Sequence, residues 1–513
     1  MPIEIDGDAT TARVMVDDES LVEDNAVEQV RTLADHPAFT EPIRVMPDTH
    51  WGAGAPIGFT MPLPDAVVPN VVGVDIGCGM AATNLGDELP LSDAERERRV
   101  REAVPMGRST HDYEDSPHLV DEFPFERATD VFDAFADAYA ERFDAEIDPI
   151  GFDFDGYDEA YFKDLCERVL RGRSSGMGHV IRSAGTLGGG NHFVEFAQGR
   201  ESGDYWLVIH SGSRYLGLAV AEYWQERATR YRRADAIREA IPAEYEQFLK
   251  FDPERVSDGD LFEWVTGGKG ESHVQKERVR ETLDGPEIER AFDVLGRLHP
   301  DADDTTGDAA GSGDTTDADA ESTDGADPES SDDDAFDEDL AALYGREAHG
   351  YYVDMLFAQQ YARWNRELMS EAICEALGVE PVDRFQSPHN LVDFGDLTIR
   401  KGATPAREGQ RLVIPFDMAQ GSVIARGRGN AEWNETAPHG AGRRMGRRDA
   451  HESLSLEEFE AAMDGVYSES VLDDTLDEAP MAYKPAEAVA DALEPTAEVV
   501  EWLDPVHNLK AHE

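Results

Sequence analysis

Cysteine, lysine and long apolar runs are scarce or missing in this sequence. Cys78, Cys166 and Cys374 form an odd, widely spaced set within 513 residues, which is not the pattern of a disulfide framework. No apolar run approaches the length of about 18 residues that a membrane helix needs, and residues 1–20 lack the features of a secretory leader. We therefore expect a soluble protein of a reducing cytoplasm with no membrane partner.

Basic residues are also scarce. Lys and Arg number 46 against 108 Asp and Glu, so the formal charge is −62, and only seven of the basic residues are lysines. Surface carboxylates hold water and cations, and molar salt screens their repulsion to a Debye length of about 3 Å. The composition thus predicts a salt-rich, halophilic cytoplasm. Against this background, residues 396–448 carry ten Arg or Lys and five Asp or Glu, which favours an anionic ligand there.

One segment has the composition of a disordered chain. Residues 301–339 contain 17 carboxylates and no Lys or Arg, and they offer little apolar area to offset the entropy of ordering. We expect an acidic, disordered insert whose edges extend to 286–344. It would separate a first part, residues 1–285, from a second part, residues 345–513.

The remaining pattern favours an α+β fold. Helices and strands come in blocks without regular βαβ alternation, and no internal repeat is present. The predicted elements are a buried strand running into a glycine turn at 67–80, a strand ending in a polar loop at 205–214, helices at 216–240 and 347–377, and short strands at 411–417 and 422–430.

Polar residues collect where the predicted strands end. Each of His192, His210, His389 and His439 has Gly, Ser, Pro or Asn beside it. Asp75 and Cys78 stand three apart in a glycine-rich turn, so a carboxylate and a thiolate could converge on one ion. A lone Cys or His is more often structural, but a mixed N, O and S set suits a borderline divalent metal such as Mn, Zn or Fe.

Glycine-rich stretches recur at 52–58, 185–190, 427–429 and 440–446. Glycine lets backbone N–H groups approach an anion closely, so several such loops in one chain suggest phosphate binding. Ordinary turns are the competing interpretation of any single loop. The run GTLGGG lacks the acidic residue about 20 positions later that a dinucleotide-binding fingerprint requires.

Ten ordered motifs together resemble one family, the RtcB RNA ligases. The resemblance covers roughly residue 41 to the C-terminus apart from the insert. The motifs are MPDTHWGAGAPIGF, GVDIGCGM, GGGNHFVE, HSGSR, HN at 389–390, RKGATPA, PFDMAQGS, RGRGN, HGAGR and EAPMAY. Two details depart from the family pattern, namely Pro438 before His439 and the PFDMAQGS loop.

The resemblance implies a single large catalytic domain with central mixed or antiparallel sheets flanked by helices. It implies an enzyme that joins an RNA 3′-phosphate or 2′,3′-cyclic phosphate to a 5′-hydroxyl in tRNA splicing or RNA repair. GTP and two Mn²⁺ ions per site would be its cofactors, and an archease-like activator a further partner.

The resemblance also assigns residues. His439 would be the nucleophile that takes GMP. The metal ligands would be Asp75, Cys78, His192, His210 and His389, and the nucleotide contacts Asn191, Glu195, Asn390, Asp417, Ser422, Gly440, Ala441, Gly442, Tyr483 and Lys510. Either Glu195 or another acid would select guanine by accepting its N1–H and exocyclic amine.

Two other functions fit parts of the pattern. A metal-dependent phosphoesterase could open RNA cyclic phosphates with the same cluster without joining ends. An acidic RNA-binding or scaffold protein could hold a purely structural metal. HGAGR, which hydrolysis does not need, and five ligands around one cysteine favour the ligase.

Overall fold

The computed structural model describes residues 2–16, 22–117, 119–149, 154–253, 255–256, 261, 264–265, 272–296, 298 and 340–511. Residues 301–339, the predicted acidic insert, lie outside the described residues. The described residues fall into two compact units, one formed by residues up to 223 and from 344 onward, the other by residues 224–298 and 340–343. Among them, no helix has the length and apolar character needed to cross a bilayer.

The first unit contains a sheet of seven strands in the order β10-β6-β8-β7-β17-β15-β14, and all neighbours are antiparallel. The interior strand β8 reads YWLVIHS and is almost entirely buried, as expected for a run of β-branched and aromatic residues. The bounds are β10 Asp383–Pro388, β6 Gly79–Gly86, β8 Tyr205–Ser211, β7 Phe193–Gly199, β17 Ala497–Leu509, β15 Ser422–Gly427 and β14 Arg411–Pro415.

A second sheet of the same unit has the order β1-β2-β3-β4-β12-β11, with one parallel pair, β2 and β3. Its strands are β1 Ile3–Asp6, β2 Thr11–Val14, β3 Ile43–Val45, β4 Phe59–Pro62, β12 Thr398–Lys401 and β11 Asn390–Asp393. A short pair, β13 Ala403–Pro405 and β16 Thr436–Pro438, leads the chain to His439.

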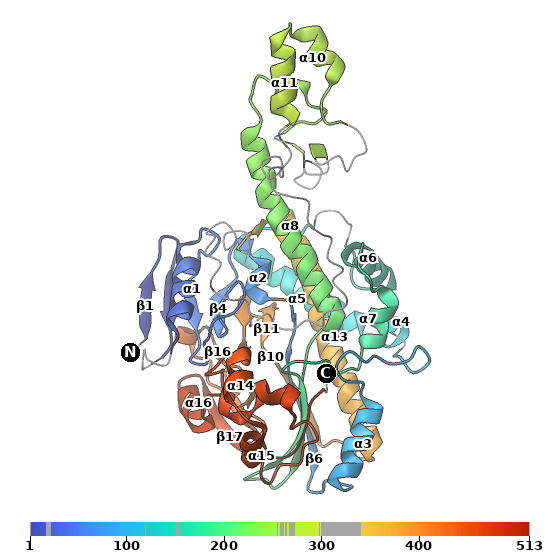
Figure 1. The fold of residues 1–513 in the computed structure, drawn as a ribbon, viewed down its shortest axis with the longest axis vertical. Helices are drawn as coiled ribbons and strands as arrows, with labels where there is room; N and C mark the ends of the chain where they lie inside the picture. Colours follow the sequence, from blue (N-terminus) through green and yellow to red (C-terminus); the bar gives the residue numbers. More distant parts are fainter. Residues whose placement is uncertain are drawn as a thin grey trace. The chain divides into compact units, whose positions relative to one another are not determined.

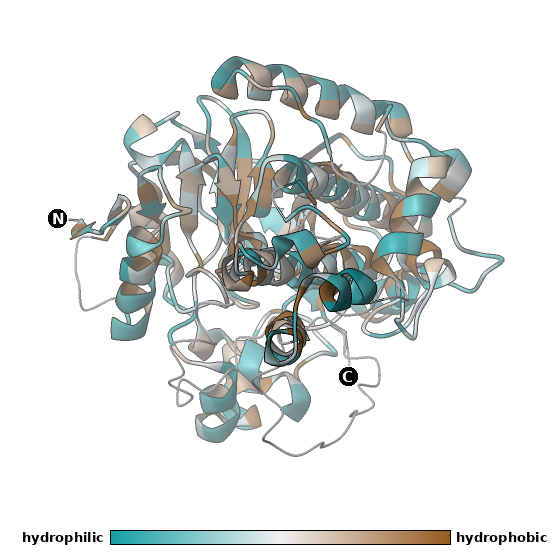
Figure 2. Cartoon of the chain, turned by 90° about the horizontal axis from the view of Figure 1, so that it is seen from above, coloured by the Kyte–Doolittle hydropathy of each residue, from teal (hydrophilic) through white to brown (hydrophobic). Residues whose placement is uncertain are grey.

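Helix α13, Gly345–Leu377, runs through this unit against α3, Asp93–Ala103, and against β8 and β6 (Figure 1). Its residues are buried on nearly all sides, which is the pattern of a central helix. It ends at Gly378, whose φ of 70° is left-handed. Apolar residues gather on the strands and inner helix faces, whereas outer helix turns are mostly hydrophilic (Figure 2).

Shorter helices surround these layers. They are α1 Asp24–Asp35, α2 Pro69–Val72, α4 Leu119–Glu122, α5 Phe125–Phe143, α6 Glu159–Val169, α7 Met177–Ser183, α14 Arg447–Ser453, α15 Leu456–Ala462 and α16 Ala486–Leu493.

The second unit has a small apolar core of its own. It contains the later turns of α8, Arg214–Ala240, with η2 Glu246–Phe248, α10 Lys276–Thr282 and α11 Pro286–Gly296. Ile237, Phe248 and Leu295 are among its buried residues.

The structure confirms the α+β class and the predicted elements at 205–214, 216–240, 347–377, 411–417 and 422–430. The strand predicted to lead into the glycine turn at 67–80 is wrong. Before that turn only Ala66–Val67 is extended, and Pro69–Val72 is helical because proline is favoured in the first helical turn. The strand β6 begins after the glycine turn, at Gly79.

The predicted edge of the insert at residue 286 is also wrong. Residues 286–296 form α11, and Ala291 and Leu295 of this helix lie in the core of the second unit. The amphipathic spacing of PEIERAFDVLG is the signal for this helix.

Candidate active site

Four neighbouring strands of the seven-stranded sheet bring polar residues to the same end of the sheet. Cys78 precedes β6, His192 precedes β7, His210 lies in β8 and His389 follows β10. Because these neighbouring strands are antiparallel, the first residues of β6 and β7 lie beside the last residues of β8 and β10. The backbone N–H of His389 donates to the Cys78 carbonyl at 2.9 Å, which holds the two segments side by side.

The side chains at this edge form one compact cluster. Cys78 Sγ lies 3.2 Å from His210 Nε2 and 3.5 Å from His192 Nε2. His210 Nε2 lies 3.2 Å from His389 Nε2, and His192 Nε2 lies 3.1 Å from Asp75 Oδ2. Two ligand sets result, Cys78 with His210 and His389, and Asp75 with Cys78 and His192. The two sets share the Cys78 sulfur, and each could hold a metal ion.

The electrostatics of the cluster fit a divalent cation. Burial lowers the pKa of His210 and His389 well below the ordinary value, which keeps both imidazoles neutral and able to coordinate. Burial would raise the pKa of Asp75, but its bond with His192 holds that pKa below its usual range. Burial and then Asp75 raise the pKa of the Cys78 thiol, a cost that a bound cation would reverse.

The histidine orientations are also set. Asn191 is exposed, but its carbonyl lies 3.2 Å from His210 Nδ1, which directs Nε2 toward Cys78. His192 Nδ1 is buried and has no partner within the described residues. The donor set therefore fits a borderline divalent metal through neutral nitrogens, a sulfur and a carboxylate.

His439 stands against this cluster. Its ring centroid lies 4.8 Å from that of His389. Its Nδ1 lies 2.7 Å from Asp48 Oδ2, and its backbone N–H donates to the same oxygen at 3.2 Å. A carboxylate accepts, so Nδ1 of His439 donates to Asp48. In the neutral ring, Nε2 is then the nitrogen that keeps a lone pair.

Asp48 was not among the residues predicted from the sequence. It is fully buried in the loop after β3, within the MPDTH motif. Lys484 Nζ donates to the carbonyls of Pro47 and Thr49, at 3.2 and 3.4 Å, on either side of Asp48. Its place in the motif MPDTHWGAGAPIGF was the available signal in the sequence, but its partner His439 lies 391 positions away.

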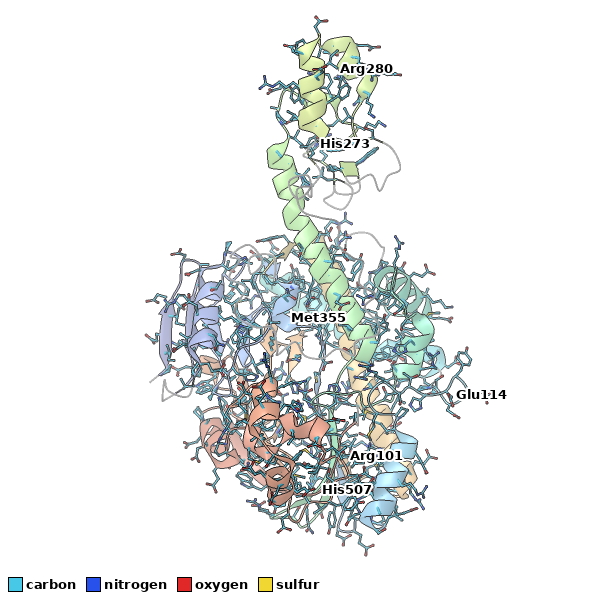
Figure 3. The ribbon with its side chains drawn as sticks, viewed as in Figure 1. Arg101, Glu114, His273, Arg280, Met355 and His507 are labelled. Carbon is cyan, nitrogen blue, oxygen red and sulfur yellow. The ribbon has the colours of Figure 1, made fainter. Side chains whose placement is uncertain are left out.

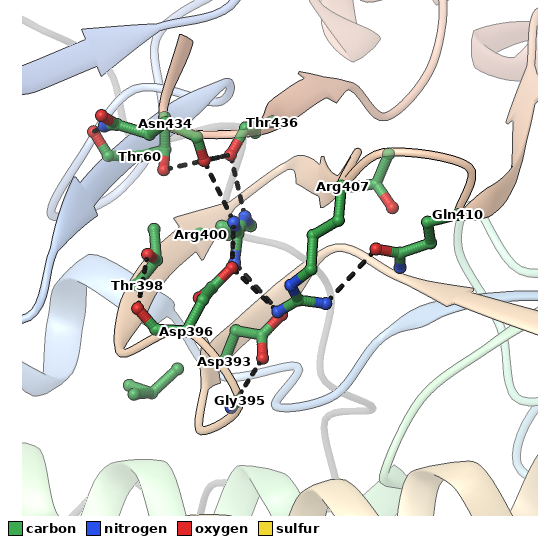
Figure 4. A network of polar contacts seen from close by, with 12 residues as sticks. Thr60, Asp393, Gly395, Asp396, Thr398, Arg400, Arg407, Gln410, Asn434 and Thr436 are labelled. Atoms are coloured by element: carbon green, nitrogen blue, oxygen red, sulfur yellow. Dashed lines mark hydrogen bonds and ion pairs between the residues drawn. The ribbon is translucent and has the colours of Figure 1, made fainter. Parts of the chain in front are cut away.

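The strand pair that carries His439 is anchored by a buried network (Figure 4). Arg400 is fully buried and forms ion pairs with Asp393 and Asp396 at 3.2 and 2.8 Å. It also donates to Thr436 Oγ1 at 2.9 Å and to the Asn434 carbonyl at 3.2 Å. This network ties β12 to β16, the strand directly before His439.

Glu195 provides a second buried acid near the sheet edge. Asn508 Nδ2 donates to its Oε2 at 3.1 Å, while Oε1 is buried and has no partner within the described residues. Burial raises the pKa of Glu195 to about 8, and the nearby Asp417 adds to the rise. Asp417 accepts from the N–H groups of Ala419 and Gln420, each at 2.9 Å.

Ser422 begins β15, and its hydroxyl is also buried without a partner within the described residues. Unsatisfied buried polar atoms are rare in folded proteins and call for an explanation. The free oxygens of Glu195 and Ser422 are places where a polar ligand could supply the missing hydrogen bonds.

Lys510 and Tyr483 meet at a carboxylate that sequence reasoning missed. Glu478 Oε2 accepts from Lys510 Nζ at 2.7 Å and from the Tyr483 hydroxyl at 2.8 Å, and Arg443 Nη1 lies 3.2 Å from Oε1. Burial would raise the pKa of Glu478, but Lys510 and Arg443 outweigh burial and hold it below its usual range. Glu478 therefore acts as the anion that binds these three groups together.

Contacts with α3 fix the end of β17, which carries Asn508 and is followed directly by Lys510. Arg101 and His507, labelled in Figure 3, lie 2.6 and 2.5 Å from the two carboxylate oxygens of Glu97. Arg101 also donates to the Lys510 carbonyl at 3.1 Å.

The remaining predicted nucleotide contacts lie around His439. Asn390 Oδ1 accepts from the Gly402 N–H at 2.8 Å, and a Cβ on Gly402 would lie 3.3 Å from His439 Cε1. Ala441 is buried. Gly442 has a φ of 68°, and a Cβ there would lie 2.4 Å from the Asp48 carbonyl oxygen. With Gly440, these residues form a tight loop beside Asp48.

Comparison with known proteins gives a consistent family. The family model for the tRNA-splicing ligase RtcB matches residues 29–252 and 323–511. The RNA-splicing ligase RtcB of Escherichia coli strain K12 is 28% identical over 500 residues, covering 93% of this chain and 92% of that protein. The tRNA-splicing ligase RtcB of Nanoarchaeum equitans is 30% identical over 254 residues, 44% of this chain and 50% of that protein.

Proposed function

The chain belongs to the tRNA-splicing ligase RtcB family, and from this membership we propose a GTP- and Mn²⁺-dependent RNA ligase. It would join RNA 3′-phosphate or 2′,3′-cyclic phosphate ends to 5′-hydroxyl ends in tRNA splicing or RNA repair. The observation that carries the proposal is the position of His439, whose Nδ1 is held by Asp48 and whose ring stands against His389 of the ligand cluster.

The first step uses the free nitrogen of His439. Its Nε2 attacks the α-phosphorus of GTP, a P–N bond forms, and the bond to the leaving pyrophosphate breaks. Asp48 keeps the proton on Nδ1 and stabilises the positive charge that the ring gains during attack. The product is a histidine–GMP phosphoramidate.

Asp75, Cys78, His192, His210 and His389 would hold two Mn²⁺ ions beside this nucleophile. When bound, such ions neutralise charge on phosphate oxygens and orient the leaving group. The support for this assignment is the donor set, with neutral imidazoles and one shared sulfur.

The guanine would be recognised from the side of Glu195. Burial favours the protonated acid in the protein without nucleotide, so Glu195 would release its proton on binding guanine. The free Oε1 of the ionised acid would then accept the guanine N1–H and exocyclic amine, a pair of donors that adenine does not offer in this pattern. Tyr483 and Lys510 would lie near the base. Asn191, Asn390, Asp417, Ser422 and the loop of Gly440, Ala441 and Gly442 would complete the nucleotide contacts.

The later steps transfer the activated GMP. The RNA 3′-phosphate attacks the phosphorus of histidine–GMP, which releases the His439 imidazole and leaves an RNA-ppG end. The RNA 5′-hydroxyl then attacks the 3′-phosphate, forms the phosphodiester and expels GMP. A cyclic phosphate is first opened by water to the 3′-phosphate. RNA ends are thus the substrates, and an archease-like activator is a proposed partner.

The proposed site also bears on domain organisation. Its residues come from both 1–285 and 345–513, which supports the proposal that these two parts form one catalytic domain interrupted by the acidic insert.

A labelling assay tests the nucleophile. Incubation with α-³²P-labelled GTP and Mn²⁺ should label the protein covalently, and mass spectrometry should map the modification to His439. His439→Ala should remove the label, whereas His451→Ala, a half-exposed histidine of α14, should retain it. Label that persists in His439→Ala would contradict the proposed nucleophile. Opening of cyclic phosphates without ligated product, with any nucleotide, would favour the phosphoesterase.

A further inference from the structure

Two adjacent residues of α13 connect the segments that carry the cluster. Asn365 is fully buried and Arg366 is 2% exposed. Neither side chain is among the ligand atoms of the cluster. Their hydrogen bonds go to the backbone and side chains beside the ligands, so they lie behind the cluster.

Arg366 binds three segments. Its Nη1 donates to the Gly77 carbonyl at 2.7 Å and to the Ser211 carbonyl at 2.6 Å. Its Nε donates to Gln386 Oε1 at 2.9 Å. Gly77 directly precedes Cys78, Ser211 directly follows His210, and Gln386 lies on β10 three residues before His389. One planar guanidinium thus spans the supports of three ligands.

Asn365 binds the loop that leads to His192. Its Oδ1 accepts from the N–H groups of Gly185 and Thr186, at 2.7 and 3.1 Å. Its Nδ2 donates to the Thr186 carbonyl at 3.2 Å, to Ser211 Oγ at 3.1 Å and to the Gly212 carbonyl at 3.2 Å. The amide therefore joins the loop before His192 to the loop after His210.

The charge of Arg366 has no carboxylate partner among its hydrogen bonds in the described residues. All three acceptors are neutral oxygens. A buried cation is costly unless opposite charge lies near it. Burial lowers the pKa of Arg366 to about 10, while Cys78 and Asp75 act in the opposite direction. The Asp75 carboxylate is thus the negative charge of the cluster that favours the charged form of Arg366.

Close packing reinforces this connection. A Cβ on Gly77 would lie 2.9 Å from Ala362 Cβ, one helical turn before Arg366. The turn that holds Asp75 and Cys78 therefore lies directly on α13. A shift of the helix would move this turn with it.

We propose that Asn365 and Arg366 are positioning residues that hold the Cys78, His192, His210 and His389 segments in ligand geometry before any ion binds. Arg366 also supplies a positive charge near Asp75. The inference rests on the metal centre of the proposed function. In this proposal, α13 holds the ligand segments in place, and the metal binds to segments that are already positioned.

Cobalt binding tests the role of Arg366 in the full-length protein. Co²⁺ bound by Cys78 should give a thiolate-to-cobalt charge-transfer band, whose intensity reports the Cys78 bond. We expect Arg366→Met to weaken Co²⁺ binding about 10- to 100-fold and to reduce the band per bound ion. Arg366→Lys, which keeps the charge but not the planar fork, should fall between Arg366→Met and the unmodified protein.

Arg363→Met is the matched control, because Arg363 lies on the same helix, is half-exposed and forms an ion pair with Glu367 at 3.1 Å. It should bind Co²⁺ as the unmodified protein does. A purely structural role would lower the melting temperature of the metal-free variants without changing the band per bound cobalt. Equal affinity and equal band in Arg366→Met would overturn the proposal.

Hydrogen exchange provides a test that needs no variant. In the metal-free protein, the N–H groups of Gly185 and Thr186 should be strongly protected, because Asn365 holds them without a metal. Rapid exchange of both would refute the positioning role. If the unmodified protein binds neither Co²⁺ nor Mn²⁺, the proposed metal centre fails, while hydrogen exchange still decides whether α13 orders these loops.

Discussion

Replacing Glu195 by glutamine should change how stability depends on pH. Glu195 is 1% exposed, one of its oxygens has no partner within the described residues, and its pKa is raised from 4.5 to about 8. The folded protein therefore favours the protonated acid. Between pH 4.5 and 8 the unfolded chain has released this proton and the folded chain retains it, so the free energy of unfolding falls as pH rises.

The size of the effect follows from the same values. Each pH unit between the two pKa values corresponds to about 1.4 kcal/mol, so the whole interval corresponds to roughly 5 kcal/mol as an upper bound. Glutamine keeps the shape and can still accept from Asn508, but it never ionises. The unfolding free energy of Glu195→Gln minus that of the unmodified protein should thus rise from pH 5 to pH 8 and then level off.

Urea unfolding followed by circular dichroism, at one fixed KCl concentration from pH 5 to 9, measures this difference. Subtracting the two proteins removes the contributions of groups that they share. Glu498→Gln, an exposed position on β17, reports the effect of the same exchange at the surface. If the curves of Glu195→Gln and the unmodified protein stay parallel from pH 5 to 9, the assignment of Glu195 as a neutral buried acid is refuted.

Three further substitutions test other parts of the site. Asp48→Asn should slow covalent labelling with GTP about 10²- to 10⁴-fold, measured as single-turnover guanylylation, because the amide no longer fixes the tautomer of His439; an unchanged rate would contradict this role. Glu478→Gln should lower the free energy of unfolding in urea by about 3–5 kcal/mol, because the buried cations Lys510 and Arg443 lose their anionic partner. A loss below about 1 kcal/mol would contradict the role of Glu478 as the anion of this buried group. Arg400→Leu should cost an amount similar to Glu478→Gln, whereas Arg384→Leu, which removes an exposed ion pair, should cost about 0–1 kcal/mol; equal losses would show that burial does not decide the effect.

Part of the fold followed from local patterns. The run YWLVIHS is apolar on both faces and forms the interior strand β8. The long segment with helical spacing of apolar residues at 347–377 forms α13. The strand predicted at 67–80 failed because a short apolar run fits either a strand or a helix, and Pro69 decided for the helix. Helix α11 was missed because the edge of the insert was predicted from composition alone, although the spacing of its own apolar residues is amphipathic.

Some residues of the candidate site were likewise predicted from local sequence, whereas others were recognised only in the structure. His192, His210, His389 and His439 could be singled out because each sits beside turn residues at a strand or loop edge. The partners Asp48 and Glu478 lie in the motifs MPDTHWGAGAPIGF and EAPMAY, but neither motif shows which distant residue its acid contacts. Asp48 meets His439 and Glu478 meets Lys510 only through contacts across 391 and 32 residues.

By itself, the sequence determined the chemistry that is present: a mixed set of sulfur, imidazole and carboxylate donors, a histidine in a glycine-rich loop, and motifs in the order of one ligase family. These properties reside in residue identity and short spacing. The tertiary structure alone decided which donors share an ion site, which carboxylate orients His439 and how α13 supports the cluster. Strand register and helix packing set those distances, and both depend on pairings between segments far apart in the chain.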